Sequence, residues 1–240
     1  MHVTRIFASA ALACTVTLLL SLGAPLLADT VAESNLLARA AIADEVENFS
    51  LLGDIEAEAL ALPDTFAVRS DDRLTLTFSS GLTRSYQNNP ECKNVEREAD
   101  CRKYKLIVHS HAHRAFIILQ AYYEDVEYLI VDDNSAEEVV LPAFPIFSPS
   151  GNRMLVRVIN DGMVGFQVQF WKRNGDRFVS EWSGTPFFTG QYMNYDFVGW
   201  PDEDVIDLRA DENRNSVEPN IVTNFQLRHT SAGWSIVRLP

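Results

Sequence analysis

The chain has 240 residues, of which 47% are hydrophobic, so it can build one domain with a sizeable core, and global disorder is excluded. Its 33 acidic residues outnumber 20 lysines and arginines, which gives a net charge of −13 and a pI near 4.7. Such a surface repels phosphate backbones and anionic lipids, so neither nucleic-acid binding nor membrane docking through a basic patch is expected. A cationic partner or a divalent metal fits this charge better.

The first segment has the order of a secretory signal. Arg5 is the only Lys, Arg, Asp or Glu before Asp29, and an apolar run from Ile6 to Leu22 follows it. The segment ends at a small residue, Ala28, where cleavage is expected. The sequence therefore predicts a signal peptide over residues 1–28 and a periplasmic or secreted protein. An uncleaved anchor is the alternative, and it would be the chain's only contact with a membrane.

Two cysteines, Cys92 and Cys101, remain after residues 1–28 are removed. An even number of cysteines in an exported chain predicts a disulfide. Closing this short polar loop is worth about 2–3 kcal/mol by the loop-entropy relation. A metal pair is the alternative, but the spacing does not match a zinc knuckle.

Residues 29–62 are rich in Ala, Leu and Glu and predict a helical segment. Apolar residues recur near helical spacing at Leu36, Ala40, Val46 and Phe49. Gly53 is the expected point of interruption. We expect this segment to pack on the domain that follows, with a spacer between membrane and domain as the alternative.

Residues 63–240 predict an all-β domain, because short runs rich in Val, Ile, Phe, Tyr and Trp alternate with turn signals. The predicted strands are Leu74–Phe78, Tyr104–Val108, Ala115–Tyr123, Glu127–Val131, Glu138–Leu141, Met154–Ile159, Phe166–Trp171, Phe178–Trp182, Asn194–Val198, Val205–Arg209, Ile221–Arg228 and Trp234–Arg238. This pattern is typical of a β-sandwich, a barrel or a propeller.

A repeat favours the propeller. Residues 129–141 align with residues 169–182, and Asn134 then stands over Asn174, an offset of 40 residues (174 − 134). Each unit can be divided into four strands. A four-stranded unit with a period of about 40–45 residues is that of a propeller blade.

The stretch F-P-I-F-S-P-S-G-N-R-M-L-V, residues 144–156, resembles the "P-x-F-S-P-D-G-K-x-L-x-V" element of TolB-type and WD40-type β-propeller blades. In those families the element is the first strand, a tight turn and the start of the second strand. The resemblance implies blade-like units, and residues 63–240 have room for three to four of them, in a small or incomplete β-propeller that follows the short N-terminal helix. A β-sandwich remains the alternative fold.

Three histidines, His109, His111 and His113, are spaced two residues apart. On one continuous strand they would share a face and could bind zinc or copper. The repeat offset instead places them over Ser148–Arg153, in the turn between the first and second strands of their unit. We therefore expect an exposed polar turn and no cofactor, with a metal site as the alternative.

In a propeller blade, the turns joining strands one to two and three to four emerge on the same rim. Loops held by a rigid β scaffold often carry binding, so we expect this rim to be the interaction face. Its candidate residues are His109, His111, His113, Asp133, Trp200, Asp202 and His229.

No catalytic signature of the common kinds is present in the sequence. The expected function is therefore non-catalytic binding or scaffolding in the periplasm or cell envelope, with a protein partner. Two alternatives stay open: a metal-dependent hydrolase that uses the His109, His111 and His113 turn, and an acidic secreted inhibitor of a cationic envelope enzyme.

Overall fold

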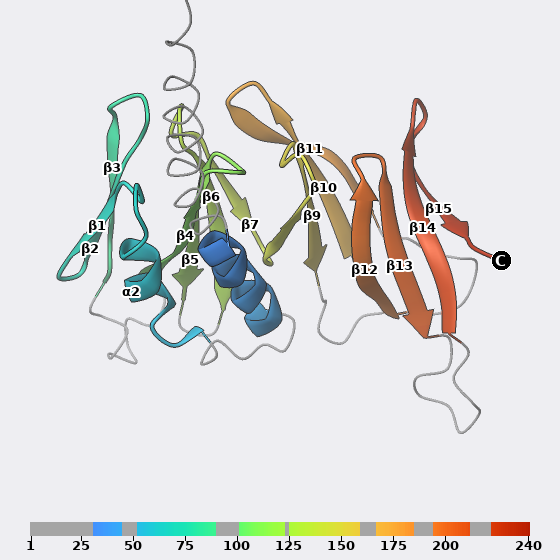
Figure 1. Ribbon diagram of the computed structural model, residues 1–240, viewed down its shortest axis with the longest axis horizontal. Helices are drawn as coiled ribbons and strands as arrows, with labels where there is room; N and C mark the ends of the chain where they lie inside the picture. The colour runs from blue at the N-terminus through green and yellow to red at the C-terminus, as the bar shows by residue number, and fades with distance from the viewer. Residues whose placement is uncertain are drawn as a thin grey trace, which may run out of the picture.

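The computed structural model describes residues 31–44, 52–89, 101–122, 125–158, 167–184, 194–211 and 222–240. Within these ranges the chain is mostly β, with two short helices and four antiparallel sheets. The sheets follow one another in chain order across Figure 1. The strands form four sheets of three or four strands, rather than the two layers of a sandwich, and no closed barrel.

The first sheet has three strands and the other three sheets have four, each paired in an up-and-down order. Sheet 1 contains β1 (Ala67–Ser70), β2 (Arg73–Thr77) and β3 (Thr83–Gln87). Sheet 2 contains β4 (Lys103–Ser110), β5 (Ala115–Ala121), β6 (Val126–Asp132) and β7 (Glu138–Leu141). Sheet 3 contains β8 (Pro145–Phe147), β9 (Arg153–Val158), β10 (Gln167–Asn174) and β11 (Arg177–Gly184). Sheet 4 contains β12 (Asn194–Asp202), β13 (Val205–Asp211), β14 (Val222–Thr230) and β15 (Gly233–Arg238).

The burial of the strands shows how the sheets stack. In sheet 2, β5 is buried on both faces over six consecutive residues, which fits its continuous apolar sequence. In the end sheets, β2 and β14 alternate between buried and exposed residues, so only one face of each is covered. Sheet 2 therefore lies between neighbours, whereas sheets 1 and 4 each turn one face to solvent.

The outward faces of the end sheets are largely polar. On sheet 1, Thr75 and Ser85 share a hydrogen bond of 3.0 Å, and Arg73 Nε donates to Gln87 Oε1 at 3.1 Å. On sheet 4, Gln226 Nε2 donates to Asp207 Oδ1 at 2.8 Å. Solvated outer faces of this kind are what terminal units of a stacked array require.

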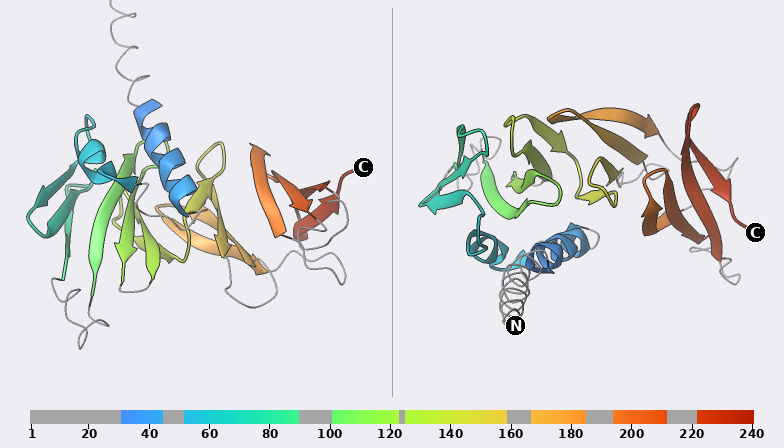
Figure 2. Two further views of the ribbon diagram at one scale, coloured as in Figure 1. Left: turned by 90° about the horizontal axis from the view of Figure 1, so that it is seen from below. Right: turned by 45° about the horizontal axis from the view of Figure 1, so that its top comes forward.

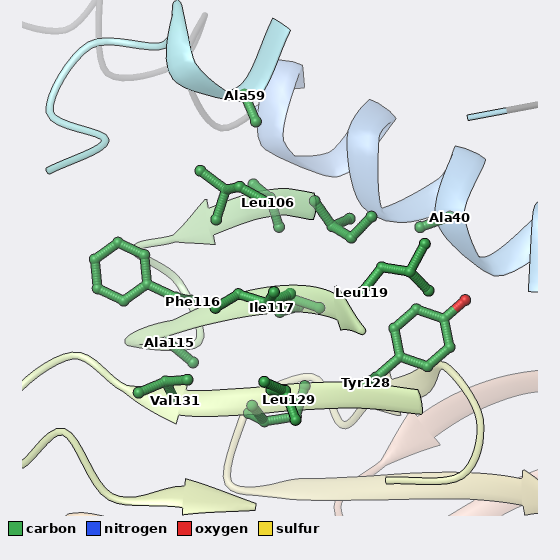
Figure 3. Packing of buried hydrophobic residues seen from close by; sticks show 14 of the residues in the cluster. Ala40, Ala59, Leu106, Ala115, Phe116, Ile117, Leu119, Tyr128, Leu129 and Val131 are labelled. Carbon is green, nitrogen blue, oxygen red and sulfur yellow. The ribbon is translucent and has the colours of Figure 1, made fainter. Parts of the chain in front are cut away.

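Two helices lie on the inner side of the open arc that the sheets form (Figure 2). Helix 31–44 buries Leu36, Ala40 and Ala43 at helical spacing, in the same core as sheets 1 and 2. Helix 31–44 thus packs on the β domain. Figure 3 shows Ala40 facing the apolar side chains of sheet 2.

The second helix, α2 (Ile55–Leu60), covers the inner edge of β4. Its Glu56 accepts hydrogen bonds from the backbone N–H of Leu106 at 2.8 Å and from Arg69 Nη2 at 2.5 Å. An uncovered edge strand invites pairing with another chain, and this contact removes that risk. The predicted interruption between the helices is present, because Gly53 adopts a left-handed conformation with φ of +50°.

The core has two parts. The larger cluster joins the helices to sheets 1 and 2 and part of sheet 3, and Figure 3 shows its centre around Leu106, Ile117 and Leu129. The smaller cluster joins sheets 3 and 4, where Phe170 stacks on Trp234 at 3.9 Å between ring centroids. This division bears on stability, because the described residues of sheet 4 contribute apolar side chains to the smaller cluster and not to the larger one.

The sequence predicted twelve of these strands to within a few residues, but it missed β1, β3 and, outside the resemblance, β8. No helix among the described residues is long and apolar enough to cross a membrane. The predicted signal peptide, residues 1–28, lies outside the described ranges. So does Cys92, the expected partner of the buried Cys101, and the disulfide therefore stays a prediction.

Candidate interaction rim

The turns that join strands one to two and three to four of each four-stranded sheet share one edge, because antiparallel neighbours reverse direction at each turn. In sheet 1 the β2–β3 turn lies on the same edge. We call this set of turns the turn rim; it consists of residues 78–82, 111–114, 133–137, 148–152, 175–176, 203–204 and 231–232. Figure 1 shows the β10–β11, β12–β13 and β14–β15 turns along its upper side.

Hydrogen bonds join the turn rim across every boundary between sheets. From sheet 1, Ser79 donates its backbone N–H and its hydroxyl to the carbonyl oxygen of Asp133 in sheet 2, at 2.9 and 3.0 Å. From sheet 2, Asn134 Nδ2 donates to Asp176 Oδ2 of sheet 3 at 3.1 Å. From sheet 3, the N–H of Ser150 donates to Glu203 Oε1 of sheet 4 at 2.7 Å.

A buried ion pair lies beneath the boundary between sheets 2 and 3. Arg173, with 6% of its side chain exposed, binds Asp132, with 2% exposed, and donates to the carbonyl oxygen of His113 at 2.7 Å. Burial alone would raise the pKa of Asp132, but hydrogen bonds from Ser135, Arg173 and Asn134 outweigh it and hold that pKa below its ordinary value.

Arg153 has the same role at the boundary between sheets 3 and 4. Its guanidinium binds Glu181 through Nε at 3.0 Å and Asp204 through Nη1 at 2.8 Å. It also donates to the carbonyl oxygen of Glu203 and lies 5.7 Å from the ring centroid of Trp234. One nearly buried side chain thus holds four groups from two sheets.

His109 lies at the end of β4 and not in the turn, because the strand continues to Ser110. Its ring is 1% exposed and stacks on Phe116 at 4.0 Å. Nδ1 lies 3.1 Å from the carbonyl oxygen of Asp64, and Nε2 lies 3.5 Å from Asp133 Oδ2. Burial lowers the pKa of His109 below its ordinary value, against the opposite effect of Asp133.

His111 lies in the β4–β5 turn and is 46% exposed. Its Nδ1 lies 2.7 Å from Oε1 of Glu33, a residue of helix 31–44 whose side chain is 8% exposed. The other oxygen of Glu33 accepts from the His111 N–H at 3.2 Å and from Ser110 Oγ at 3.4 Å. Glu33 therefore attaches the helix to the turn rim.

His113 has a third set of contacts. Its ring stacks on Phe147 of β8 at 4.0 Å, with 7° between the planes. Burial, together with the nearby charge of Arg173, lowers the pKa of His113 to about 4. Gly151 of the neighbouring turn lies so close that a Cβ atom there would meet His113 Nδ1 at 2.7 Å. His113 is thus packed between sheets 2 and 3.

The three histidines therefore have different partners: Asp64 and Phe116 for His109, Glu33 for His111, and Phe147 for His113, although the His109 and His111 rings lie 4.4 Å apart. Within the described ranges, no group of three His, Cys, Asp or Glu residues is arranged to hold a metal ion. The two-residue spacing that suggested a shared metal face does not produce one here, because the strand ends at Ser110.

His229 lies in β14 and reaches the boundary between sheets 3 and 4. Its Nδ1 is 3.2 Å from Asp204 Oδ1, and its Nε2 is 3.5 Å from Glu181 Oε1. It thus joins the group around Arg153, with 25% of its side chain exposed.

Of the remaining candidates, Asp133 lies in the turn rim, Asp202 ends β12 next to the rim, and Trp200 lies outside it. Asp202 is exposed and accepts a hydrogen bond from the N–H of Asp204 at 3.1 Å. Trp200 was expected in a turn, but β12 extends through Asp202 and the half-buried indole packs edge-on against Phe170 at 6.5 Å. Trp200 therefore contributes to the smaller core cluster.

A shallow pocket of about 190 Å³ lies between helix 31–44 and strands β8, β9 and β12. Its lining residues are Ala41, Asp44, Phe144, Ile146, Arg157 and Phe197. It is smaller than the pockets of roughly 300–1,000 Å³ that hold small-molecule ligands. The turn rim is therefore the stronger candidate site.

Sequence reasoning missed four residues that shape the rim, namely Glu33, Phe66, Arg153 and Arg173. One signal was available for Arg173, because the 40-residue offset places the acidic pair Asp132-Asp133 over the basic pair Lys172-Arg173. Glu33 and Phe66 lie outside the repeat, and nothing in their local sequence marks them.

Comparison with family models, with curated proteins and with solved structures gave no match to this chain.

Proposed function

We propose that this chain is an exported, non-catalytic binding or scaffolding module of the periplasm or cell envelope, and that the turn rim is the face that meets its protein partner. The observation that carries the proposal is the hydrogen bonding across all three sheet boundaries, from Ser79, Asn134 and Ser150. A surface fixed in this way loses little conformational freedom on binding.

The charge of the rim supports a basic partner. Glu137, Asp176, Asp202 and Asp204 lie in or next to its turns and are exposed, and the whole chain carries a net charge of −13. Complementary charge speeds the encounter of two proteins and selects between partners. An inhibitor of a cationic envelope enzyme would be one form of such a module.

The finer fold belongs to the same proposal: the four sheets act as blade-like units of an open, propeller-like arc. Sheets 2, 3 and 4 each have four strands in up-and-down order, and the segments aligned by the 40-residue repeat lie on β6–β7 and on β10–β11. Sheet 1 has three strands, and α2 precedes β1 in the chain.

Export is supported by the sequence of residues 1–28, with Arg5 ahead of an apolar run and Ala28 before Asp29. In that compartment the pairing of Cys92 with Cys101 would close a loop next to β4.

The test compares partner recovery between two variants. Glu137→Ser with Asp202→Ser removes two exposed rim charges, and neither side chain makes a contact between sheets. Asp72→Ser with Asp125→Ser is the matched control, because both residues lie in turns on the opposite edge. Each protein is cross-linked in cells, purified from the membrane and periplasmic fractions, and its partners are quantified.

The proposal predicts that the wild type and the control recover the same salt-sensitive basic partner. The rim variant should recover at least about fivefold less, which corresponds to roughly 1 kcal/mol. Equal recovery by the rim variant, or loss in the control alone, would show that the turn rim is not the binding face.

A further inference from the structure

Phe66 is the one aromatic residue among the exposed large hydrophobic side chains of the described ranges, with 56% of its surface exposed. It lies just before β1, at the edge of sheet 1 that belongs to the turn rim. Its backbone has φ of +51°, in the left-handed region. Bulky residues rarely adopt this region, which Gly and Asn adopt more readily.

The surrounding structure holds Phe66 in this conformation. Its carbonyl oxygen accepts from the N–H of Thr77 at 2.7 Å. The preceding residue, Thr65, is buried and its hydroxyl lies 2.8 Å from the carbonyl oxygen of Ala59. Asp64, also left-handed with φ of +55°, offers its carbonyl oxygen to His109 Nδ1. Strained residues that a fold holds this firmly cluster at sites that contact ligands.

The neighbours of Phe66 form an acidic and aromatic surface. The Phe66 ring lies edge-on to His109 at 6.0 Å, and the His109 ring lies 4.4 Å from that of His111, which is 46% exposed. Asp64 is exposed beside Phe66, and Asp133 carries its carboxylate next to His109. We call Asp64, Phe66, His111 and Asp133 the junction patch.

We infer that the junction patch is the point at which the turn rim binds an arginine side chain of its protein partner. A guanidinium is flat and weakly hydrated, so it stacks on an exposed ring such as Phe66 while pairing with carboxylates such as Asp64 and Asp133. An ammonium group is more strongly hydrated and gains less from the ring. The inference rests on the proposed function, since it names the chemistry of the partner.

The experiment measures the binding of fluorescein-labelled hexa-arginine and hexa-lysine peptides by fluorescence anisotropy at low ionic strength. The test variant is Phe66→Asn, which removes the ring and suits the left-handed backbone. The control is Val68→Thr, which changes another exposed apolar residue of sheet 1. The rim variant Glu137→Ser with Asp202→Ser is measured alongside.

We expect the wild type to bind hexa-arginine more tightly than hexa-lysine. Phe66→Asn should weaken hexa-arginine binding about fivefold and remove the preference for arginine, with no fall in the thermal midpoint, whereas Val68→Thr should bind as the wild type does. If Phe66→Asn binds as the wild type does while the rim variant binds more weakly, the inference is overturned and the proposed function stands. If the wild type binds neither peptide, the inference is overturned, and the partner-recovery experiment above still decides the proposed function.

Discussion

At the scale of single residues, both the backbone conformation and the packing at position 151 require glycine. Its φ of +71° suits glycine, and a Cβ atom would lie 2.7 Å from His113 Nδ1. Gly175 has a similar φ of +66°, but a Cβ atom there would have nothing within 4 Å. Alanine variants of the two glycines can therefore distinguish the cost of backbone strain from the cost of a steric clash.

We predict that Gly151→Ala lowers the free energy of unfolding by at least about 2 kcal/mol, and that Gly175→Ala lowers it by about 1 kcal/mol. The larger loss arises because the His113 ring must leave its stack on Phe147. Urea denaturation of the two variants provides the measurement, and equal losses would contradict the packing described for His113.

His113 also predicts how stability depends on pH. Its pKa in the folded state is lowered from 6.5 to about 4, so between these values the unfolded chain binds more protons than the folded chain. The stabilisation from neutral His113 is therefore complete above about pH 6.5 and is lost as the pH falls toward 4.

Replacing His113 with Phe keeps a flat ring on Phe147 and removes the titration. We predict that His113→Phe makes the free energy of unfolding less dependent on pH between 6.5 and 4. Urea denaturation at several pH values measures this slope, and a variant with the wild-type slope would disprove the assignment. Some slope should remain, because burial lowers the pKa of His109 as well.

Some features of single residues could not be predicted from the sequence. The left-handed backbone of Phe66 cannot be predicted from local sequence, because distant residues hold it. Thr77 donates to the Phe66 carbonyl oxygen, and Ala59 and His109 bond to the neighbouring Thr65 and Asp64. The three histidines were expected in one exposed turn, but β4 continues to Ser110, so His109 lies in the strand and is buried.

At the scale of elements, helix 31–44 depends on both apolar packing and one polar attachment. Ala40 and Leu36 pack into the core, and Glu33 binds three donors at the β4–β5 turn. Removing the carboxylate would leave the Ser110 hydroxyl and the His111 N–H without this acceptor in a buried place.

We predict that Glu33→Ala costs about 2 kcal/mol and increases amide exchange in helix 31–44. Glu58→Ala is the control, because its ion pair with Arg39 is between partners that are 51% and 37% exposed, and its loss should cost about 0.5 kcal/mol or less. Hydrogen-exchange mass spectrometry reports on the helix directly. Unchanged exchange over residues 31–44 in Glu33→Ala would show that the apolar face alone holds the helix.

Strands β5 and β6 of sheet 2 could be predicted from the sequence, whereas β1 and β3 of sheet 1 could not, for a physical reason. Strands β5 and β6 are buried over most of their length, so their sequences are continuous apolar runs. Strands β1 and β3, with the sequences A-V-R-S and T-R-S-Y-Q, are short and mostly face solvent. Such strands carry little hydrophobic signal, and only their pairing with β2 makes them strands.

At the scale of the whole molecule, Arg153 connects sheets 3 and 4, at the boundary that we expect to be the weakest of the arc. Sheet 4 shares only the smaller core cluster with sheet 3, and Arg153 binds Glu181 on one side and Asp204 on the other. Removing the Arg153 ion pairs should destabilise sheet 4 first, because sheet 4 is not part of the larger core cluster.

We predict that Arg153→Ala lowers the free energy of unfolding by about 3 kcal/mol, since it removes the guanidinium that the partly buried Glu181 and Asp204 share. Protection from hydrogen exchange should fall in β12–β15 and persist in β4–β6. A uniform loss of protection over all four sheets would mean that the arc unfolds as one unit and that this boundary is not the weakest.

The repeat and the turn signals predicted where the rim would lie, because both depend on the local alternation of strand and turn. The residues that fix the rim depend on contacts between distant segments, such as Arg173 with Asp132 and Ser150 with Glu203. The position of Trp200 was predicted wrongly for the same reason, because it depends on packing between Trp200 of sheet 4 and Phe170 of sheet 3.

The turn rim, with Phe66 in its junction patch, is the face that we propose for the partner. Hydrogen exchange of the chain with and without its purified partner tests this proposal at every turn of the rim at once. We predict slower exchange in residues 64–66, 111–114 and 133–137 of the complex, and no change in the β5–β6 turn on the opposite edge. Protection of that opposite edge, with exchange at the turn rim unchanged, would contradict the proposal.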